Sequence, residues 1–395
     1  MSSRHIIAVC ALLTGIVTVS CSKDTPYGGD SPILLRVDAE GTRAAVIDST
    51  SIKTAPGKFI LDAYVDRDVV GDGGVVIVKE GTPYIDSNGN ENVEYNSSTK
   101  KWDFNDGATH YWVENYASIS FWSYTKTQNG KNPITIDKDK SALYPTAKNV
   151  DPDKGVKMVF DYSLPANDAS GDATNQEDLI FAYNCESYGG SGSQAVKIHF
   201  YHALAQVRFA FSTDDNTFTT DHIILKSIAI GNVASGGTCT FFGNQAVTET
   251  AKSTPSDREV EKIFMWSDLA EKKSYDQPYN VTFVSGDATY DGWTKGEYKK
   301  ESHPYNLYTC QNVFMMLPQT LADDACIRLT IVDTSVTPNQ EHTYTSYING
   351  DTWKAGKYYT YKLNYSKSDA YDATFKALLV DWGDNKNVNF PTINE

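Results

Sequence analysis

Residues 59–66 read FILDAYVD, and every second side chain along this run is apolar. The side chains that an extended chain would place on the same side are Phe59, Leu61, Ala63 and Val65. A period of two is typical of a β-strand with one buried face. Residues 59–66 therefore predict a strand, and similar patterns recur from end to end of the chain.

Short alternating runs separated by turn-forming clusters make up most of the sequence. The runs lie at residues 75–79, 118–124, 156–162, 195–201, 204–211, 222–230, 313–317, 326–332, 342–348, 357–365 and 374–382. Gly-rich clusters such as residues 71–74 and 235–237 are typical of the turns between strands. Only residues 263–272 have a pattern that could form a short helix. The pattern predicts an all-β protein of mostly antiparallel β-sandwiches.

The chain of 395 residues is longer than one hydrophobic core usually serves, so we expect two β-sandwich domains in series. The Gly/Ser-rich residues 188–193 are the predicted seam, which gives domains at residues 44–190 and 191–395. The alternative is that the same residues form a long hairpin loop inside one domain.

The net charge of -15 argues against nucleic acid as a partner, because phosphate binding needs clustered Lys and Arg. The composition includes 25 Tyr and 16 Phe and is 40% hydrophobic, which favours an extracellular sheet protein. Composition thus points away from the cytoplasm and toward a secreted protein.

The amino-terminal residues indicate export and a lipid anchor. Arg4 precedes an apolar run at residues 6–19, which is too short for the roughly 20 residues of a spanning helix and typical of a signal peptide at residues 1–20. Small residues then precede Cys21, which we expect to be lipidated, and residues 22–24 resemble a signal for export to the outer face of the outer membrane. The alternative is an ordinary secretory signal followed by an incidental cysteine.

Residues 33–40 predict a strand that a protease can remove. Its inward side chains would be Ile33, Leu35, Val37 and Ala39. Arg43 follows, with Ala44 after it, and a cut there would detach the lipid and the strand together, as a leader at residues 21–43. The vacated groove would take a strand from a neighbour by β-augmentation, and such a contact propagates into a fibre. The alternative is the first strand of a monomeric domain.

Several motifs together resemble the fimbrillin family of type V pilus subunits. They are DLIFAY at residues 178–183, HFYHALAQVRF at 199–209, NVFMMLPQ at 312–319, WKAGKYYTYKL at 353–363 and ALLVDW at 377–382. The resemblance implies two tandem transthyretin-like β-sandwich domains, secretion as a lipoprotein and cleavage after an arginine. By position Arg43 matches that processing site, with Arg36 as a second choice.

The same resemblance implies polymerisation through a C-terminal donor segment. In this chain the candidate apolar side chains of such a tail are Val388, Phe390 and Ile393. Pro391 lies among them and limits how far a donor strand could pair. The expected partners are other pilus subunits, the outer membrane through the lipid on Cys21, and a host glycan or protein receptor. We expect a surface-exposed outer-membrane lipoprotein that enters a pilus after processing, in a stalk, tip or anchor position.

No motif for catalysis or for a cofactor stands out. His199 and His202 are three positions apart, so a strand would point them to opposite faces, and we expect structural histidines and no metal site. There is no Gly-x-Ser-x-Gly, His-Glu-x-x-His or phosphate-binding loop. The sequence therefore predicts a binding and assembly protein and not an enzyme.

Two features leave alternatives open. One is a set of cysteines that either form two disulfides of unknown pairing or act as small buried side chains: Cys185, Cys239, Cys310 and Cys326. The other is a cluster of aromatic residues that either stack on sugars or belong to the core: Trp102, Tyr111, Trp112, Tyr116, Trp122 and Tyr124. A monomeric glycan-binding surface lipoprotein is the alternative function.

Overall fold

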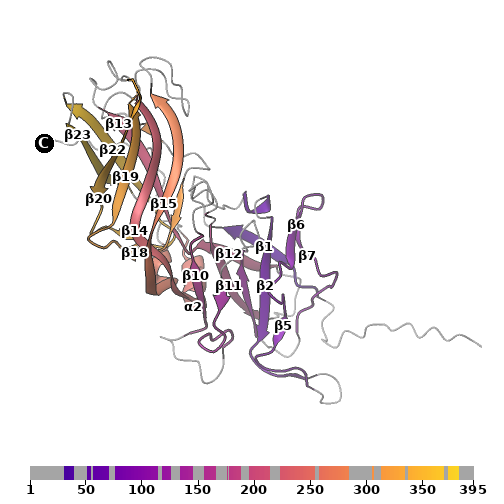
Figure 1. The fold of residues 1–395 in the computed structure, drawn as a ribbon. Helices are drawn as coiled ribbons and strands as arrows, with labels where there is room; N and C mark the ends of the chain where they lie inside the picture. The colour runs from indigo at the N-terminus through magenta and orange to yellow at the C-terminus, as the bar shows by residue number, and fades with distance from the viewer. Residues whose placement is uncertain are drawn as a thin grey trace, which may run out of the picture.

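A computed structural model gives the fold of the chain (Figure 1). The residues that it describes are 31–39, 51–54, 57–70, 76–113, 118–125, 134–145, 155–165, 176, 178–187, 195–213, 223–253, 258–283, 305–306, 313–333, 337–368 and 372–381. Most of them lie in strands, which confirms the predicted all-β class. Strands occur in every alternating run that the sequence indicated.

Eight strands form one sheet in the lower lobe of Figure 1. They are β1 (Leu35–Ala39), β2 (Lys58–Val65), β5 (Pro83–Ile85), β6 (Val93–Asn96), β7 (Lys101–Phe104), β8 (Ser118–Tyr124), β11 (Ile180–Ser187) and β12 (Val196–His202). Their order is β5-β2-β6-β7-β1-β12-β11-β8. Because β2 also pairs with β8, the strands from β2 to β8 close into a ring.

Two further sheets build the upper lobe of Figure 1, and the first of them extends down to β10 (Lys157–Ser163), which lies beside the helix α2 (Gly243–Ala251) and β11. The first contains β9 (Thr135–Ile136), β10 (Lys157–Ser163), β14 (Ile223–Phe242), β15 (Phe264–Phe283), β19 (Cys326–Asp333) and β20 (Gln340–Tyr347). The second contains β13 (Ala205–Thr213), β16 (Tyr305–Asn306), β17 (Phe314–Met316), β22 (Tyr358–Ser368) and β23 (Asp372–Asp381). The remaining elements are the pairs β3 (Val69–Val70) with β4 (Val76–Val78) and β18 (Gln319–Thr320) with β21 (Thr352–Trp353), the helix α2 (Gly243–Ala251), and the 3-10 turns η1 (Ser51–Lys53) and η3 (Val260–Lys262).

Most strand pairs are antiparallel, as the sequence predicted, but two are parallel. β1 runs parallel to β12, and β13 runs parallel to β22. Strands on either side of the predicted seam share sheets, since β10 pairs with β14 and β1 pairs with β12. The division into two domains at residues 190 and 191 stays a prediction.

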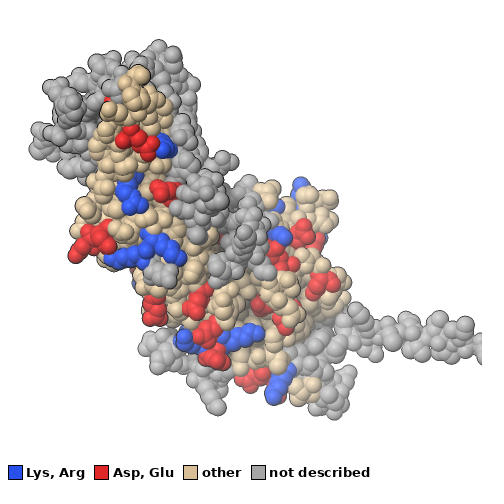
Figure 2. Space-filling view, viewed as in Figure 1, with Lys and Arg blue, Asp and Glu red and all other residues tan. Residues whose placement is uncertain are grey.

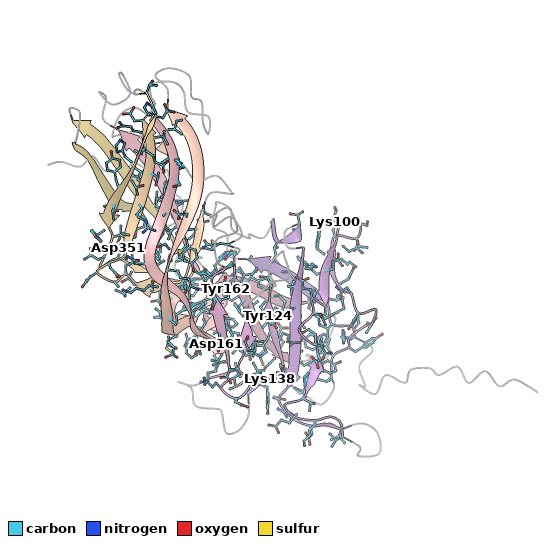
Figure 3. The ribbon with its side chains drawn as sticks, viewed as in Figure 1. Lys100, Tyr124, Lys138, Asp161, Tyr162 and Asp351 are labelled. Carbon is cyan, nitrogen blue, oxygen red and sulfur yellow. The ribbon has the colours of Figure 1, made fainter. Side chains whose placement is uncertain are left out.

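Two hydrophobic cores lie on opposite faces of β8 and β11. Alternation along β8 puts Ile119 and Phe121 in the core inside the ring, and Trp122 and Tyr124 in the larger core shared with the upper lobe. Tyr162 on β10 belongs to that larger core, and Figure 3 shows Tyr124 and Tyr162 in the middle of the molecule. The sheet therefore joins the two lobes because both of its faces are buried.

The helix lies where the sequence did not predict one. Residues 264–272 belong to β15, which pairs with β14 over its length, so the expected helix at 263–272 is wrong. Pairing with a long neighbour overrides weak local propensity. α2 instead begins at Gly243, directly after β14, and a Cβ on this glycine would lie 2.7 Å from the Tyr183 ring. Within the described residues, no helix is long and apolar enough to cross a bilayer.

Acidic and basic side chains are interspersed on the face of the molecule shown in Figure 2. The described ion pairs include several exposed ones, such as Lys272 Nζ with Asp324 Oδ1 at 2.5 Å. An exposed pair of this kind contributes little to the free energy of folding. This face shows charges of mixed sign, in keeping with a solvated surface.

Candidate functional site

The strand β1 occupies a gap in the ring between β7 and β12. It pairs with β12 through five register positions, from Leu35 opposite Val196 to Ala39 opposite Phe200. Its pairing with β7 has one register position, Leu35 opposite Trp102. β1 is therefore held strongly along one edge and weakly along the other.

Residues before β1 extend its hydrogen bonding. The Ile33 N–H donates to the His110 carbonyl at 2.8 Å, and the Trp112 N–H donates to the Ser31 carbonyl at 3.1 Å. The Val196 N–H donates to the Leu34 carbonyl at 2.7 Å. The segment 31–39 thus bonds to two neighbouring segments, and its removal would leave backbone donors and acceptors without partners.

The inward face of β1 is apolar and completes the core of the ring. Ile33, Val37 and Ala39 are buried, and the partly buried Leu35 packs against the same core. The outward Leu34 is 42% exposed, so the strand covers the core with one face only. Each large apolar side chain in such a position contributes about 1.5–3 kcal/mol through burial.

Aromatic rings line the core beneath this face. Phe59 packs against Trp102 with ring centroids 5.3 Å apart and against Phe200 with centroids 5.2 Å apart. Trp102 and Phe200 stand on β7 and β12, the two neighbours of β1. A vacated β1 position would therefore be an apolar slot with an aromatic floor.

The outward face of β1 carries one charged contact to its parallel neighbour. The Asp38 Oδ1 atom accepts a hydrogen bond from Nδ1 of His199, which lies opposite it in the register. The other ring nitrogen, Nε2 of His199, lies 2.9 Å from Nη1 of Arg258. Because a guanidinium can only donate, Nε2 accepts and the proton of a neutral ring sits on Nδ1.

The charge of Asp38 is stabilised where it lies. Partial burial raises the pKa of its carboxyl, but the hydrogen bond from His199 and the positive charges of Lys197 and Arg36 outweigh this effect. The net result is a pKa below the usual value, so Asp38 is a carboxylate at neutral pH. Asp38, His199 and Arg258 form a chain of polar contacts, the β1 latch, from β1 across β12 to the residues before η3.

His202 has its own acidic partner. Its Nδ1 lies 2.6 Å from Oδ2 of Asp178, and both side chains are almost fully buried. The two histidines therefore contact different carboxylates, as expected for neighbours on opposite faces of a strand. Among the described residues, no group of three His, Cys, Asp or Glu lies close enough to hold a metal ion.

Several residues that the sequence singled out lie outside the described part of the chain. These are Cys21, Arg43, Ala44, Val388, Phe390 and Ile393. β1 ends at Ala39, so the predicted processing site follows the strand closely in the sequence. Lipidation, cleavage and the identity of the donor tail stay predictions.

The cysteines do not form two disulfides. Cys185, Cys239 and Cys326 are free thiols, and Cys310 lies outside the described residues. Complete burial raises the pKa of the Cys239 thiol well above its usual value, so this side chain is neutral and packs as a small apolar group.

The aromatic cluster belongs mainly to the cores. Trp102, Trp112, Trp122 and Tyr124 are all buried, Tyr111 is half-buried, and Tyr116 lies outside the described residues. Stacking on a sugar needs an exposed ring face, which the buried members do not offer. The four buried members therefore act as core side chains, which the sequence left open beside the sugar-binding alternative.

The partners of His199 could not be found from the sequence. Asp38 and His199 are 161 positions apart, and His199 and Arg258 are 59 positions apart. Only the parallel register of β1 and β12 brings the first two together. No local motif marks such a contact.

A comparison with protein families matches residues 71–382 to a family described as fimbrillin-like. Among solved structures, a fimbrial protein from Bacteroides vulgatus ATCC 8482 is 15% identical, with a TM-score of 0.50. The alignment covers 89% of this chain and 99% of that one.

A second solved structure, titled a "putative cell adhesion protein" from Bacteroides ovatus ATCC 8483, is 13% identical with a TM-score of 0.45. The alignment covers 89% of this chain and 97% of that one. No curated protein was found to match the chain.

Proposed function

The chain belongs to the fimbrillin-like family of fimbrial proteins, and on that premise we propose that it is a pilus subunit precursor activated by loss of β1. Membership of a fimbrial family indicates a cell-surface structural protein and not an enzyme. In our proposal Cys21 carries the lipid, cleavage after Arg43 frees residues 21–43, and a strand of another subunit fills the vacated slot.

The observation that carries the proposal is the position of β1 in the ring. A five-residue strand lies between β7 and β12, and its inward side chains complete the core. Without β1, the edge of β12 and the aromatic floor would be uncovered, and an exposed apolar strand edge is a template for pairing with another chain. Such a state favours capture of a replacement strand.

A replacement from another molecule would lead to a fibre. The donor strand and the acceptor slot are different parts of one subunit. Each new contact therefore leaves a free slot at one end of the growing assembly and a free donor strand at the other. We place the donor in the C-terminal tail with Val388, Phe390 and Ile393, where Pro391 limits the ladder. In β-strand addition generally, main-chain hydrogen bonds supply the affinity and side-chain pockets supply the specificity.

The first experiment tests release and assembly together. The full-length lipoprotein is treated with an Arg-specific protease, and products are followed by amino-terminal sequencing and unheated SDS gels. We expect a new amino terminus at Ala44 and SDS-resistant multimers. Arg43→Lys keeps the charge but removes the cleavage site, and it should block both products.

The matched control is Arg36→Lys, which alters the second candidate site on β1 and should leave cleavage at Arg43 unchanged. A chain that is cut after Arg43 and stays monomeric at high concentration would contradict strand exchange. If Arg36→Lys blocked cleavage and Arg43→Lys did not, the processing site would be Arg36.

The lipid and the donor tail have separate tests. Metabolic labelling with a fatty acid should fail for Cys21→Ser and persist for Cys185→Ser, since Cys185 is a thiol within the folded ring sheet. Deletion of residues 383–395 should abolish homopolymers while leaving cleavage intact. Homopolymers that survive this deletion would show that another segment donates the strand.

A further inference from the structure

We infer that the slot left by β1 selects an incoming strand that carries a carboxylate between two inward apolar side chains, as Asp38 stands between Val37 and Ala39. This inference rests on the proposed function, because it concerns the partner that replaces β1. It assigns the partner by its chemistry: an acidic donor strand of another subunit.

The departure of β1 would remove the acceptor of His199. This side chain is 8% exposed, and its Nε2 is engaged by Arg258 at 2.9 Å. The Nδ1 proton points to Asp38, so it would lose its only bonded carboxylate in the latch. A buried donor without a partner costs free energy, and a neutral apolar side chain in the slot would not restore the bond.

Positive charge would remain on the same face of β12. Lys197 and His199 stand two positions apart, so both point outward from the ring. Arg258 lies against His199, while Arg36 leaves together with β1. The emptied slot therefore has an apolar inner side and a basic outer side.

Among the residues that the structure describes, the two acids beside Arg258, Glu259 and Glu249, have other partners. Glu259 pairs with Lys262 at 2.7 Å and with Lys252 at 3.5 Å. Glu249 pairs with Lys252 at 2.7 Å and accepts the Glu259 N–H at 2.7 Å. In our proposal, the carboxylate that replaces Asp38 beside His199 comes with the incoming strand.

The proposed donor tail of this chain presents no carboxylate at the matching position. Residues 388–390 read Val-Asn-Phe, which offers an amide at the middle position, and Asp381 already belongs to β23, which pairs with β22. Hydrogen bonds to an ionised acceptor are shorter and stronger than those to a neutral one. An acidic strand should therefore displace a tail that presents Asn389.

The test captures labelled peptides as β1 leaves. Full-length protein is cleaved by the Arg-specific protease in the presence of the fluorescent peptide SPILLKVDA, which is the sequence of residues 31–39 with Arg36→Lys so that the protease spares it. The comparison peptide has in addition Asp38→Asn, which keeps the shape and removes the charge. Fluorescence anisotropy across a concentration series gives the affinity of each.

We expect the acidic peptide to bind about tenfold more tightly than the amide peptide, in line with the value of a hydrogen bond to a charged group. In a chain with His199→Phe, which keeps a ring in place and removes the donor, the two peptides should bind alike. This double-mutant cycle isolates the contact between the two side chains.

The outcomes separate the two proposals. Equal affinity of both peptides for the wild-type chain overturns the carboxylate requirement and leaves strand exchange standing. Capture of neither peptide after complete cleavage counts against the slot itself. If the His199→Phe chain does not fold, the wild-type comparison alone decides the inference.

Discussion

The two parallel strand pairs of this molecule differ in how extensively their first strand pairs with neighbours along its two edges. β1 shares five register positions with β12 and one with β7. β13 shares eight with β22, three with β17 and two with β16, so both of its edges are paired. The same kind of pairing thus appears once as a short strand with one strong edge and once as an integrated strand.

Burial shows the same contrast. Ala205, Val207 and Phe209 on β13 are completely buried, whereas Val37 on β1 retains 9% of its exposure. Both strands pair in parallel, so parallel pairing alone does not distinguish β1 from β13. In our proposal β1 is the exchangeable strand because it has few pairing positions along its β7 edge and its inward face is less completely buried.

The polar contacts of the pairs also correspond. On β13, Arg208 donates from Nε to Thr360 Oγ1 at 2.8 Å and lies over the Tyr358 ring at 3.8 Å. On β1, Asp38 reaches His199. The Arg208 side chain of β13 contacts β22 through a hydrogen bond and a cation–π contact. The β1 latch, by contrast, depends on the single carboxylate of Asp38.

The largest effect is expected from Phe209→Ala. Its ring packs against Phe314 with centroids 5.7 Å apart and near Tyr361 at 6.4 Å. Truncation of a fully buried aromatic side chain costs about 3–5 kcal/mol. Urea unfolding followed by circular dichroism should show a correspondingly lower midpoint, with loss of the upper lobe as a unit.

A smaller and local effect is expected from Val37→Ala on β1. This substitution removes two methyl groups from the buried Val37 side chain, which should lower the free energy of unfolding by about 1–2 kcal/mol. Hydrogen exchange should accelerate at the β12 amides that face β1, and the amides of β13 should be unchanged. A cost equal to that of Phe209→Ala would erase the proposed difference between the two strands.

The sequence predicted the elements better than it predicted their partners. Alternation alone identified the β1 segment and the direction of its apolar face, because a period of two is a local property. It could not pair β1 with a strand that begins at Val196, nor connect Asp38 to His199 and Arg258, since register is set by the fold. The sequence also suggested a short helix at residues 263–272, but residues 264–272 form a strand because they pair with β14.

The pH dependence of the β1 latch gives the next prediction. The folded pKa of Asp38 lies below its ordinary value of 3.8, so its charge stabilises the folded chain at higher pH. That contribution is lost as the pH falls through the folded pKa. Thermal unfolding of the wild type and of Asp38→Asn should therefore differ at pH 7, by roughly 1 kcal/mol or less.

Below that window the two curves should converge, because wild-type Asp38 is then protonated. The groups that set the window are His199 and Lys197 on β12 and Arg36 on β1, with Arg258 behind His199. A difference that grows as the pH falls from 5 to 3 would mean that the carboxylate of Asp38 does not hold the strand.

The smallest effect is expected from a charged contact that also spans strands but is exposed. Lys226 on β14 lies 2.6 Å from Glu341 on β20, with side chains 46% and 49% exposed. Because of solvent screening and the loss of side-chain entropy, such pairs contribute only about 0–1 kcal/mol to the free energy of folding. Lys226→Ala should shift the urea midpoint little, and raising the salt concentration should remove the remaining shift. If Lys226→Ala cost more than Asp38→Asn at pH 7, a short distance between charges would matter more than burial, and the role assigned to the β1 latch would lose its physical basis.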